Sequence, residues 1–167
     1  MDKNKFLQSD VALYGMFVSV MLVLSYIESI IPVNPPVPGM KIGLANIMVI
    51  WLLYSKGVKP AALVSLIRVL LAGFLFGNLY GILFGFAGAA FSLLVMFLLK
   101  KVKFFSVVGV SIAGGVTHNI AQVIVAVIVL ENVRISYYLP FLLASGTVAG
   151  IAIGILGGIL YKKIKIN

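Results

Sequence analysis

The sequence predicts an all-α integral membrane protein, a bundle of six transmembrane helices that forms a single transmembrane domain over residues 1–167. Hydrophobic residues make up 62% of the chain and its mean hydropathy is +1.19, whereas soluble domains contain about 45–50% apolar residues. The apolar residues form six runs, and lysines gather where these runs end. Because backbone groups find no water inside a bilayer, each crossing run must be a helix.

The six apolar runs are expected to give helices of unequal length. They cover about residues 11–31, 42–54, 60–76, 80–99, 105–130 and 138–161. The first run has no small-residue cleavage site, so we interpret it as a retained span and not as a signal peptide. The second run is short, because its roughly 13 residues would rise only about 20 Å as a helix, against roughly 30 Å of hydrocarbon. We therefore expect it to be tilted, re-entrant or flanked by a loop that dips into the bundle.

The basic residues predict how the bundle lies in the membrane. With six spans and both termini cytoplasmic, ten lysines lie inside, and only Lys41 and Arg134 lie outside. Without the second span, and with the N-terminus outside, the ratio falls to nine to three. An excess of lysine on cytoplasmic loops is the rule, so six spans in the cytoplasmic (inner) membrane are favoured. Trp51 and Tyr54, just before Lys56, are interpreted as an interfacial anchor that closes a true second span.

Composition excludes several classes of function. The formal charge is +9, but the basic residues lie at the ends of apolar runs and not on one soluble face, so nucleic-acid binding is not expected. There is no cysteine and only one histidine, and the four carboxylates form no cluster for Mg²⁺. No phosphate-binding loop of the type GxxxxGK[ST] is present. We therefore expect no catalytic residues, cofactor or metal, and any energy for transport must come from a partner or an ion gradient.

Polar residues inside the apolar runs are the candidate functional site. An ionisable group at the bilayer centre costs about 2.5–3.5 kcal/mol, so it usually lines a wet cavity or binds something polar. Arg68 lies in the middle of the third run, and His118 and Asn119 lie in the fifth. Gln122 is four residues after His118 and shares its helix face. Glu28 lies near the outer end of the first run.

These positions predict a cavity open to the outside. The proposed substrate-binding residues are Glu28, Lys41, Asn46, Arg68, His118, Asn119 and Gln122. Arg68 would form the floor, the residues of the fifth run a wall, and Glu28 and Lys41 the rim. Lys41 follows a proline-rich segment, residues 31–39, that is either a rigid connector or a lid.

The charges of this cavity favour an anionic ligand. Two or three cations would face a single carboxylate, and a buried arginine without compensation seeks an anionic partner. The alternative is structural, with Glu28 and Arg68 paired and His118 hydrogen-bonded to a neighbouring helix.

Small residues recur at every fourth position in the last predicted helix and in the fourth (Gly81, Gly85 and Ala89), and the first holds a shorter version of this pattern. The spacing lets helix backbones approach closely. The candidate partner-docking positions are Gly15 and Ser19 in the first helix, and Gly146, Gly150, Gly154 and Gly158 in the last. For the last helix the glycines serve either packing within the bundle or docking of another membrane subunit, and both alternatives remain open at this point.

Four strings carry a resemblance to a known family: Ser25-Tyr-Ile-Glu-Ser29, Pro38-Gly-Met-Lys-Ile-Gly-Leu-Ala-Asn46, Arg68-Val-Leu-Leu-Ala-Gly-Phe-Leu-Phe-Gly77 and Thr117-His-Asn-Ile-Ala-Gln122. They resemble the bacterial membrane family known as Gx transporter, also called heptaprenyl diphosphate synthase component I. The resemblance runs from about Ala12 to Gly158, and its strings coincide with the polar positions chosen above on depth alone.

By size, six spans and an outward-facing pocket, this family is similar to the S components of energy-coupling factor transporters, which capture vitamins and pass them across the membrane with a transmembrane coupling subunit and two ATPases. The resemblance implies a membrane-embedded substrate-binding subunit for a small anionic or amphiphilic molecule, such as a vitamin, flavin-like or isoprenoid compound. S components often dock through an Ala-x-x-x-Ala seam on the first helix, to which the nearest equivalent here is Gly15 to Ser19.

The second family name implies an accessory membrane subunit in prenyl diphosphate or quinone metabolism. Prenyl diphosphate synthases carry Asp-Asp-x-x-Asp motifs that hold metal, whereas both aspartates of this chain precede residue 11. In that role the chain would support a catalyst and not be one.

Overall fold

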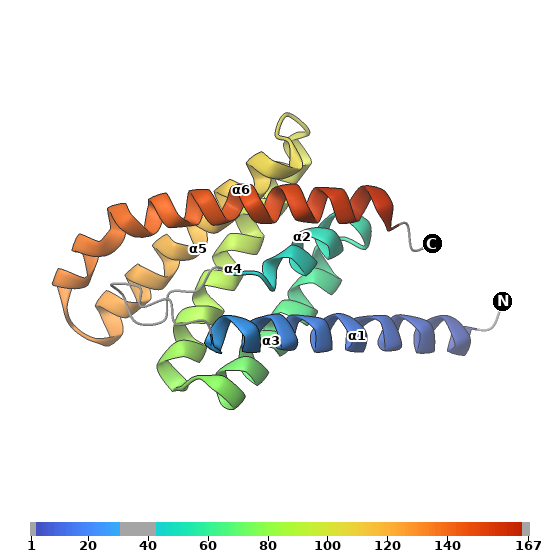
Figure 1. The fold of residues 1–167 in the computed structure, drawn as a ribbon, viewed down its shortest axis with the longest axis horizontal. Helices are drawn as coiled ribbons and strands as arrows, with labels where there is room; N and C mark the ends of the chain where they lie inside the picture. Colours follow the sequence, from blue (N-terminus) through green and yellow to red (C-terminus); the bar gives the residue numbers. More distant parts are fainter. Residues whose placement is uncertain (1–2, 31–42, 165–167) are drawn as a thin grey trace.

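The computed structural model describes residues 3–30 and 43–164, with side chains from residue 11 onward. These residues fold into six α-helices and one 3-10 helix, without a strand (Figure 1). The elements are α1 (Lys3–Ile30), α2 (Asn46–Ser55), α3 (Val58–Phe76), α4 (Leu79–Val102), α5 (Val107–Val129), η1 (Val133–Tyr138) and α6 (Leu139–Lys163). The predicted all-α fold is thereby confirmed, with helices close to the six apolar runs.

Five of the helices, all except α2, are long and apolar enough to cross a membrane. Much of their apolar surface faces outward: Phe74 at the end of α3 is 77% exposed and Leu79 at the start of α4 is 68% exposed. In water such a surface would be unfavourable, but hydrocarbon is its natural solvent. The chain is therefore a multi-pass membrane protein.

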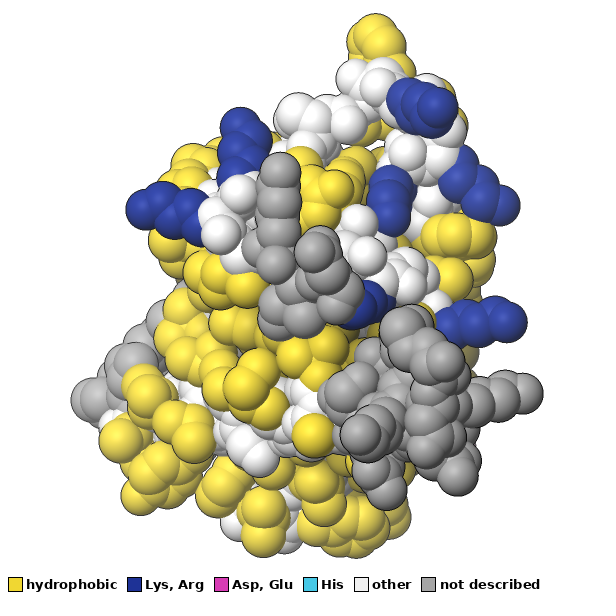
Figure 2. Space-filling view, turned by 90° about the vertical axis from the view of Figure 1, so that its right-hand side faces the viewer, with side chains coloured by type: hydrophobic (Ala, Val, Ile, Leu, Met, Phe, Trp, Pro, Cys, Tyr) yellow, Lys and Arg dark blue, Asp and Glu magenta, His cyan; other side chains and the backbone are white. Residues whose placement is uncertain are grey.

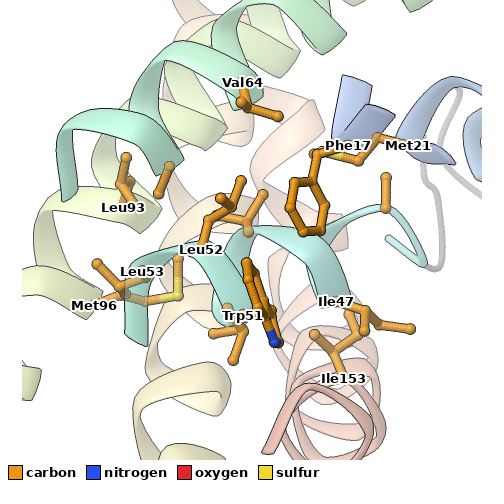
Figure 3. Packing of buried hydrophobic residues seen from close by; sticks show 14 of the residues in the cluster. Phe17, Met21, Ile47, Trp51, Leu52, Leu53, Val64, Leu93, Met96 and Ile153 are labelled. Atoms are coloured by element: carbon orange, nitrogen blue, oxygen red, sulfur yellow. The ribbon is translucent and has the colours of Figure 1, made fainter. Parts of the chain in front are cut away.

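The short helix α2 forms the centre of the bundle. It has ten residues, so it rises about 15 Å, half of what a crossing needs. It packs against α3 and α6 and touches α1, and residues 49–53 are all buried. Figure 3 shows its side chains among those of the neighbouring helices; the labelled core residues are Phe17, Met21, Ile47, Trp51, Leu52, Leu53, Val64, Leu93, Met96 and Ile153. A helix that is apolar on all sides belongs in an interior.

Two expectations about this segment need correction. The helix does not run over residues 42–54: it begins at Asn46, after a turn at residues 44–45, and ends at Ser55. Trp51 is no interfacial anchor: it is 1% exposed, and its ring stacks on Phe17 with centroids 4.9 Å apart. Its Nε1 has no hydrogen-bond partner among the described residues. Trp51 therefore gives no support to a second membrane crossing.

The described ends of the chain lie at the same end of the bundle. In Figure 1 the start of α1 and the end of α6 both lie toward the right. Figure 2 looks onto this end and shows basic side chains over it, with no acidic side chain in view among those that the structure describes. The helix termini that gather here carry Lys56, Lys59, Lys100, Lys101, Lys103, Lys162 and Lys163. We refer to this region as the lysine-rich end.

Helices α5 and α6 approach closely through three glycines of α6. A Cβ atom added at Gly150 would lie 2.6 Å from the Cα of Ile112. One added at Gly154 would lie 2.7 Å from the Cα of Val108, and one at Gly146 would lie 2.9 Å from the carbonyl oxygen of Gly115. No L side chain fits at these distances, so only glycine allows the contact.

This contact favours packing within the bundle over docking of another subunit for three of the four α6 glycines. Gly146, Gly150 and Gly154 face α5 inside the bundle, where another subunit cannot reach them without separating two helices. Gly158 is packed less tightly, since its nearest neighbour would be Val107 Cγ1 at 3.6 Å. On α1, by contrast, a Cβ at Gly15 would meet nothing within 4 Å.

Candidate functional site

The turn before α2 links three helices at the candidate site. Gly43 has a φ of +82°, a left-handed conformation that favours glycine, and its carbonyl accepts from the backbone N–H of Asn46 at 2.8 Å. Glu28 of α1 accepts from the backbone N–H of Leu44 at 2.6 Å. Arg68 of α3 donates from Nη2 to the side-chain Oδ1 of Asn46 at 3.2 Å. The turn is therefore held from both sides by charged side chains.

Within residues 11–30 and 43–164, Arg68 is held by a neutral group and is incompletely paired. Its hydrogen bond to Asn46 uses only one of the five N–H donors of a guanidinium. Its Nε is buried and has no hydrogen-bond partner among the described residues. A half-buried arginine with a buried donor left unpaired costs free energy, unless something else satisfies it.

Glu28 and Arg68 do not form the ion pair considered from the sequence. The structure describes both residues, and they do not bind each other. Glu28 binds the backbone of Leu44, and Arg68 binds the side chain of Asn46. They are close enough for electrostatic attraction. The carboxylate thus lowers the electrostatic cost of the arginine without occupying its donors.

His118 approaches the same region from α5. Its ring lies against Gly88 of α4, where an added Cβ would be only 2.7 Å from His118 Nε2. The imidazole interacts with the backbone of Gly88 as well as with the charge of Arg68, so it contacts a neighbouring helix as the structural alternative expects. Gly114, one turn before His118 on α5, leaves no free space beside it, because Met96 Sδ would lie 2.6 Å from a Cβ at Gly114. Gly88 provides the room for the imidazole.

Asn119 points away from this group. Its Nδ2 donates to the carbonyl of Leu142 in α6 at 2.6 Å, and the hydroxyl of Ser145 donates to the same carbonyl at 3.0 Å. Although Asn119 follows His118 directly, a step of one residue turns the side chain by about 100° around the helix. In this structure Asn119 therefore ties α5 to α6.

Replacing Asn119 by alanine should weaken the contact between α5 and α6 and leave small-molecule binding unchanged. Hydrogen bonds between membrane helices contribute about 0.6 kcal/mol on average and up to about 1.7 kcal/mol. We expect a loss of that size in the free energy of unfolding, measured in detergent. A loss of ligand with unchanged stability would instead assign Asn119 to the binding site.

Of the predicted site residues, the structure brings Glu28, Asn46, Arg68 and His118 together, from four different helices. Each is half-buried. Gln122 lies one turn after His118 and is also half-buried. Lys41 lies outside the described residues.

Two contributors were not found from the sequence. The backbone N–H of Leu44 binds Glu28, and backbone groups leave no signal in a sequence. Gly88 makes room for His118, and its only sequence signal is its place in the small-residue string Ala87-Gly88-Ala89-Ala90 of α4.

Residues 17–160 match the family model described as heptaprenyl diphosphate synthase component I. The match covers most of the chain and all of the site residues that the structure describes. The chain belongs to this family. The family description names one component of a synthase. Together with the long apolar helices, this description fits a membrane-associated subunit. No curated protein and no solved structure matches the chain.

Proposed function

We propose that this protein is a membrane-embedded substrate-binding subunit of a transporter, similar to an S component, for a small anionic or amphiphilic molecule. The observation that carries the proposal is Arg68: among the described residues its buried Nε has no partner, while Nη2 donates to the neutral amide of Asn46. An anionic group of a ligand, a carboxylate or a phosphate, would supply the missing acceptor. Charge-assisted hydrogen bonds of this kind are about twice as strong as neutral ones.

The neighbours of Arg68 suit a reversible site. A permanent ion pair with Glu28 would occupy the N–H donors of the guanidinium and leave none for a ligand. Glu28 instead accepts from the backbone N–H of Leu44. His118 on α5 offers a second polar group. In our proposal Gln122, on the same helix, and Asn46, on α2, also contact the ligand. Lys41 remains a proposed rim residue from the sequence. A vitamin, a flavin-like compound or an isoprenoid with an acidic group would fit this chemistry.

The proposed arrangement is one transmembrane domain with both termini in the cytoplasm of the cell, in the cytoplasmic membrane. Supporting it, α1 begins and α6 ends at the lysine-rich end (Figure 1), and lysine-rich segments are retained on the cytoplasmic side. The site would then lie toward the outer surface. Five long helices alone would place the two termini on opposite sides of the membrane, so in this arrangement α2 counts as the sixth crossing despite its short length.

Transport would require partners, a transmembrane coupling subunit and ATPases. In our proposal the coupling subunit docks on α1, where Gly15 and Ser19 are exposed on one face. The Ser19 hydroxyl donates to the carbonyl of Gly15 at 2.9 Å, so the face presents a flat apolar strip. This assignment replaces the α6 glycines as the docking position.

Native mass spectrometry of gently purified protein tests the proposal. We expect a co-purified small molecule that carries an acidic group, bound one to one. Washing the protein in buffer without this molecule should remove it. The measured mass should then fall to that of the protein alone, and the unfolding temperature should fall as well, because a ligand bound only to the folded state stabilises it. If no small molecule is retained, and no acidic compound raises the unfolding temperature of the protein, the transport proposal is wrong.

The family description favours a second candidate, an accessory membrane subunit of a prenyl diphosphate synthase. The described residues contain no group of three or more histidine, cysteine, aspartate or glutamate side chains that could hold a metal ion. In this role the chain would therefore act with a separate catalytic subunit. Co-purification of a soluble prenyl diphosphate synthase at fixed stoichiometry, without a retained small molecule, would favour this candidate over transport.

A further inference from the structure

The turn between α4 and α5 combines lysines with exposed aromatic side chains. It joins Val102, the last residue of α4, to Val107, the first of α5. Phe104 is 83% exposed, Val102 is 61% exposed and Phe105 is 41% exposed. In Figure 1 this turn, coloured yellow, stands out from the rest of the bundle. Neither the core nor the candidate site makes use of it.

The geometry of the turn keeps its apolar side chains outward. Lys103 ends α4 in a left-handed conformation with a φ of 59°. The hydroxyl of Ser106 accepts from the backbone N–H of Gly109 at 3.1 Å and caps α5. Phe104 and Phe105 meet edge to face, with centroids 5.3 Å apart. The rings thus pack on each other; Phe105 also lies beside Gly109 of α5, whereas Phe104 is left largely exposed.

The lysines around the turn have different surroundings. Lys100 is directed inward, where its Nζ donates to the carbonyl of Leu53 at 2.6 Å. Lys101 lies over the ring of Phe97, with Nζ 4.4 Å from the centroid, and remains exposed. Lys103 is exposed as well. Among the described residues no carboxylate pairs with these lysines: Glu28 lies on the far part of α1, and Glu131 follows the far end of α5.

We propose that this turn is an interfacial anchor that binds anionic phospholipid headgroups, with Phe104 inserted at the boundary between headgroups and acyl chains. The turn joins two helices long enough to cross the membrane, so it emerges at the level of the headgroups. Exposed lysines near an anionic surface each strengthen association about fivefold, and aromatic rings are favoured at the same depth. Charge and position together therefore fit a lipid surface.

The absence of cysteine from the chain makes the depth of this turn measurable. Phe104→Cys, labelled with an environment-sensitive fluorophore, is placed in nanodiscs of phosphatidylcholine, with or without phosphatidylglycerol. We expect quenching by brominated acyl chains and a blue shift of the emission, both larger with phosphatidylglycerol. Lys101→Gln together with Lys103→Gln should abolish the increase caused by phosphatidylglycerol. These residues are exposed, so the fold should be retained.

A matched control is available at the opposite end of α5. Tyr137 is 82% exposed and lies near Arg134 in sequence, so labelled Tyr137→Cys reports on a similar aromatic position without the lysine cluster. Its signal should not respond to the two lysine substitutions. The proposal is overturned if the label at position 104 stays in a water-like environment in both lipids, or if the phosphatidylglycerol effect survives the loss of both lysines. Shielding of the label only by a protein partner would likewise overturn it.

Discussion

Replacing Arg68 by alanine is expected to abolish retention of the small molecule while the protein still folds in detergent. Truncating one partner of a buried, hydrogen-bonded charge pair costs about 2–5 kcal/mol of binding free energy. The cost to folding should be smaller, because within the described part of the chain Arg68 makes a single hydrogen bond, to Asn46 at 3.2 Å, and such a bond contributes about 1 kcal/mol. Ligand occupancy by native mass spectrometry and the unfolding temperature separate the two effects.

Three companion variants sharpen this result. Arg134→Ala removes the other arginine, which is exposed and lies outside the site, and should keep full occupancy. Arg68→Lys should retain part of the affinity, because a lysine keeps the charge but cannot bind Asn46 and a ligand through one planar fork. His118→Ala should lower occupancy as well. Unchanged affinity in both Arg68→Ala and His118→Ala would reject the site.

Substituting alanine for Gly150 is expected to destabilise the bundle. The added Cβ would lie 2.6 Å from the Cα of Ile112 and 3.0 Å from the carbonyl oxygen of Ser111. These are backbone atoms that no rotamer change can move, so α5 and α6 must separate. Overpacking of this kind costs about 1–3 kcal/mol, and the contacts at Gly146 and Gly154 would weaken at the same time. The free energy of unfolding in detergent measures the loss.

The same glycine stripe supplies the control. A Cβ at Gly158 would meet Val107 Cγ1 at an ordinary 3.6 Å. Gly158→Ala should therefore be neutral or stabilise α6 by up to about 1 kcal/mol, since alanine favours a helix over glycine. Equal unfolding temperatures for Gly150→Ala and the unsubstituted protein would contradict the close contact between α5 and α6.

The long helices could be predicted from the sequence because lipid imposes a simple requirement on them. A run such as residues 80–99 must be apolar along its whole length, and the observed helix, Leu79–Val102, exceeds it by only a few residues. The short run at residues 42–54 could not be resolved in this way. Hydropathy cannot distinguish a helix buried among other helices from one that faces lipid, because both are apolar on all sides.

Trp51 illustrates the same limit. An aromatic residue near a lysine is typical of a membrane interface, but packing against Phe17 decides its position here, and that contact joins residues far apart in the chain.

The candidate site was partly predictable. Arg68 and His118 could be found because ionisable groups inside apolar runs are costly and therefore informative. Their convergence with Glu28 and Asn46 depends on the turn at residues 43–46, whose key donor is the backbone of Leu44. Asn119 could not be separated from His118 without knowing which helix covers each side of α5. The distinction required the positions of α4 and α6, to which these two side chains are directed.

A crystal structure of the protein purified with its small molecule tests the central claim most directly. Our account predicts an acidic group of the ligand within hydrogen-bond distance of Arg68 Nε, with His118 contacting the same molecule. A ligand bound elsewhere on the protein, with Arg68 still held only by Asn46, would contradict it.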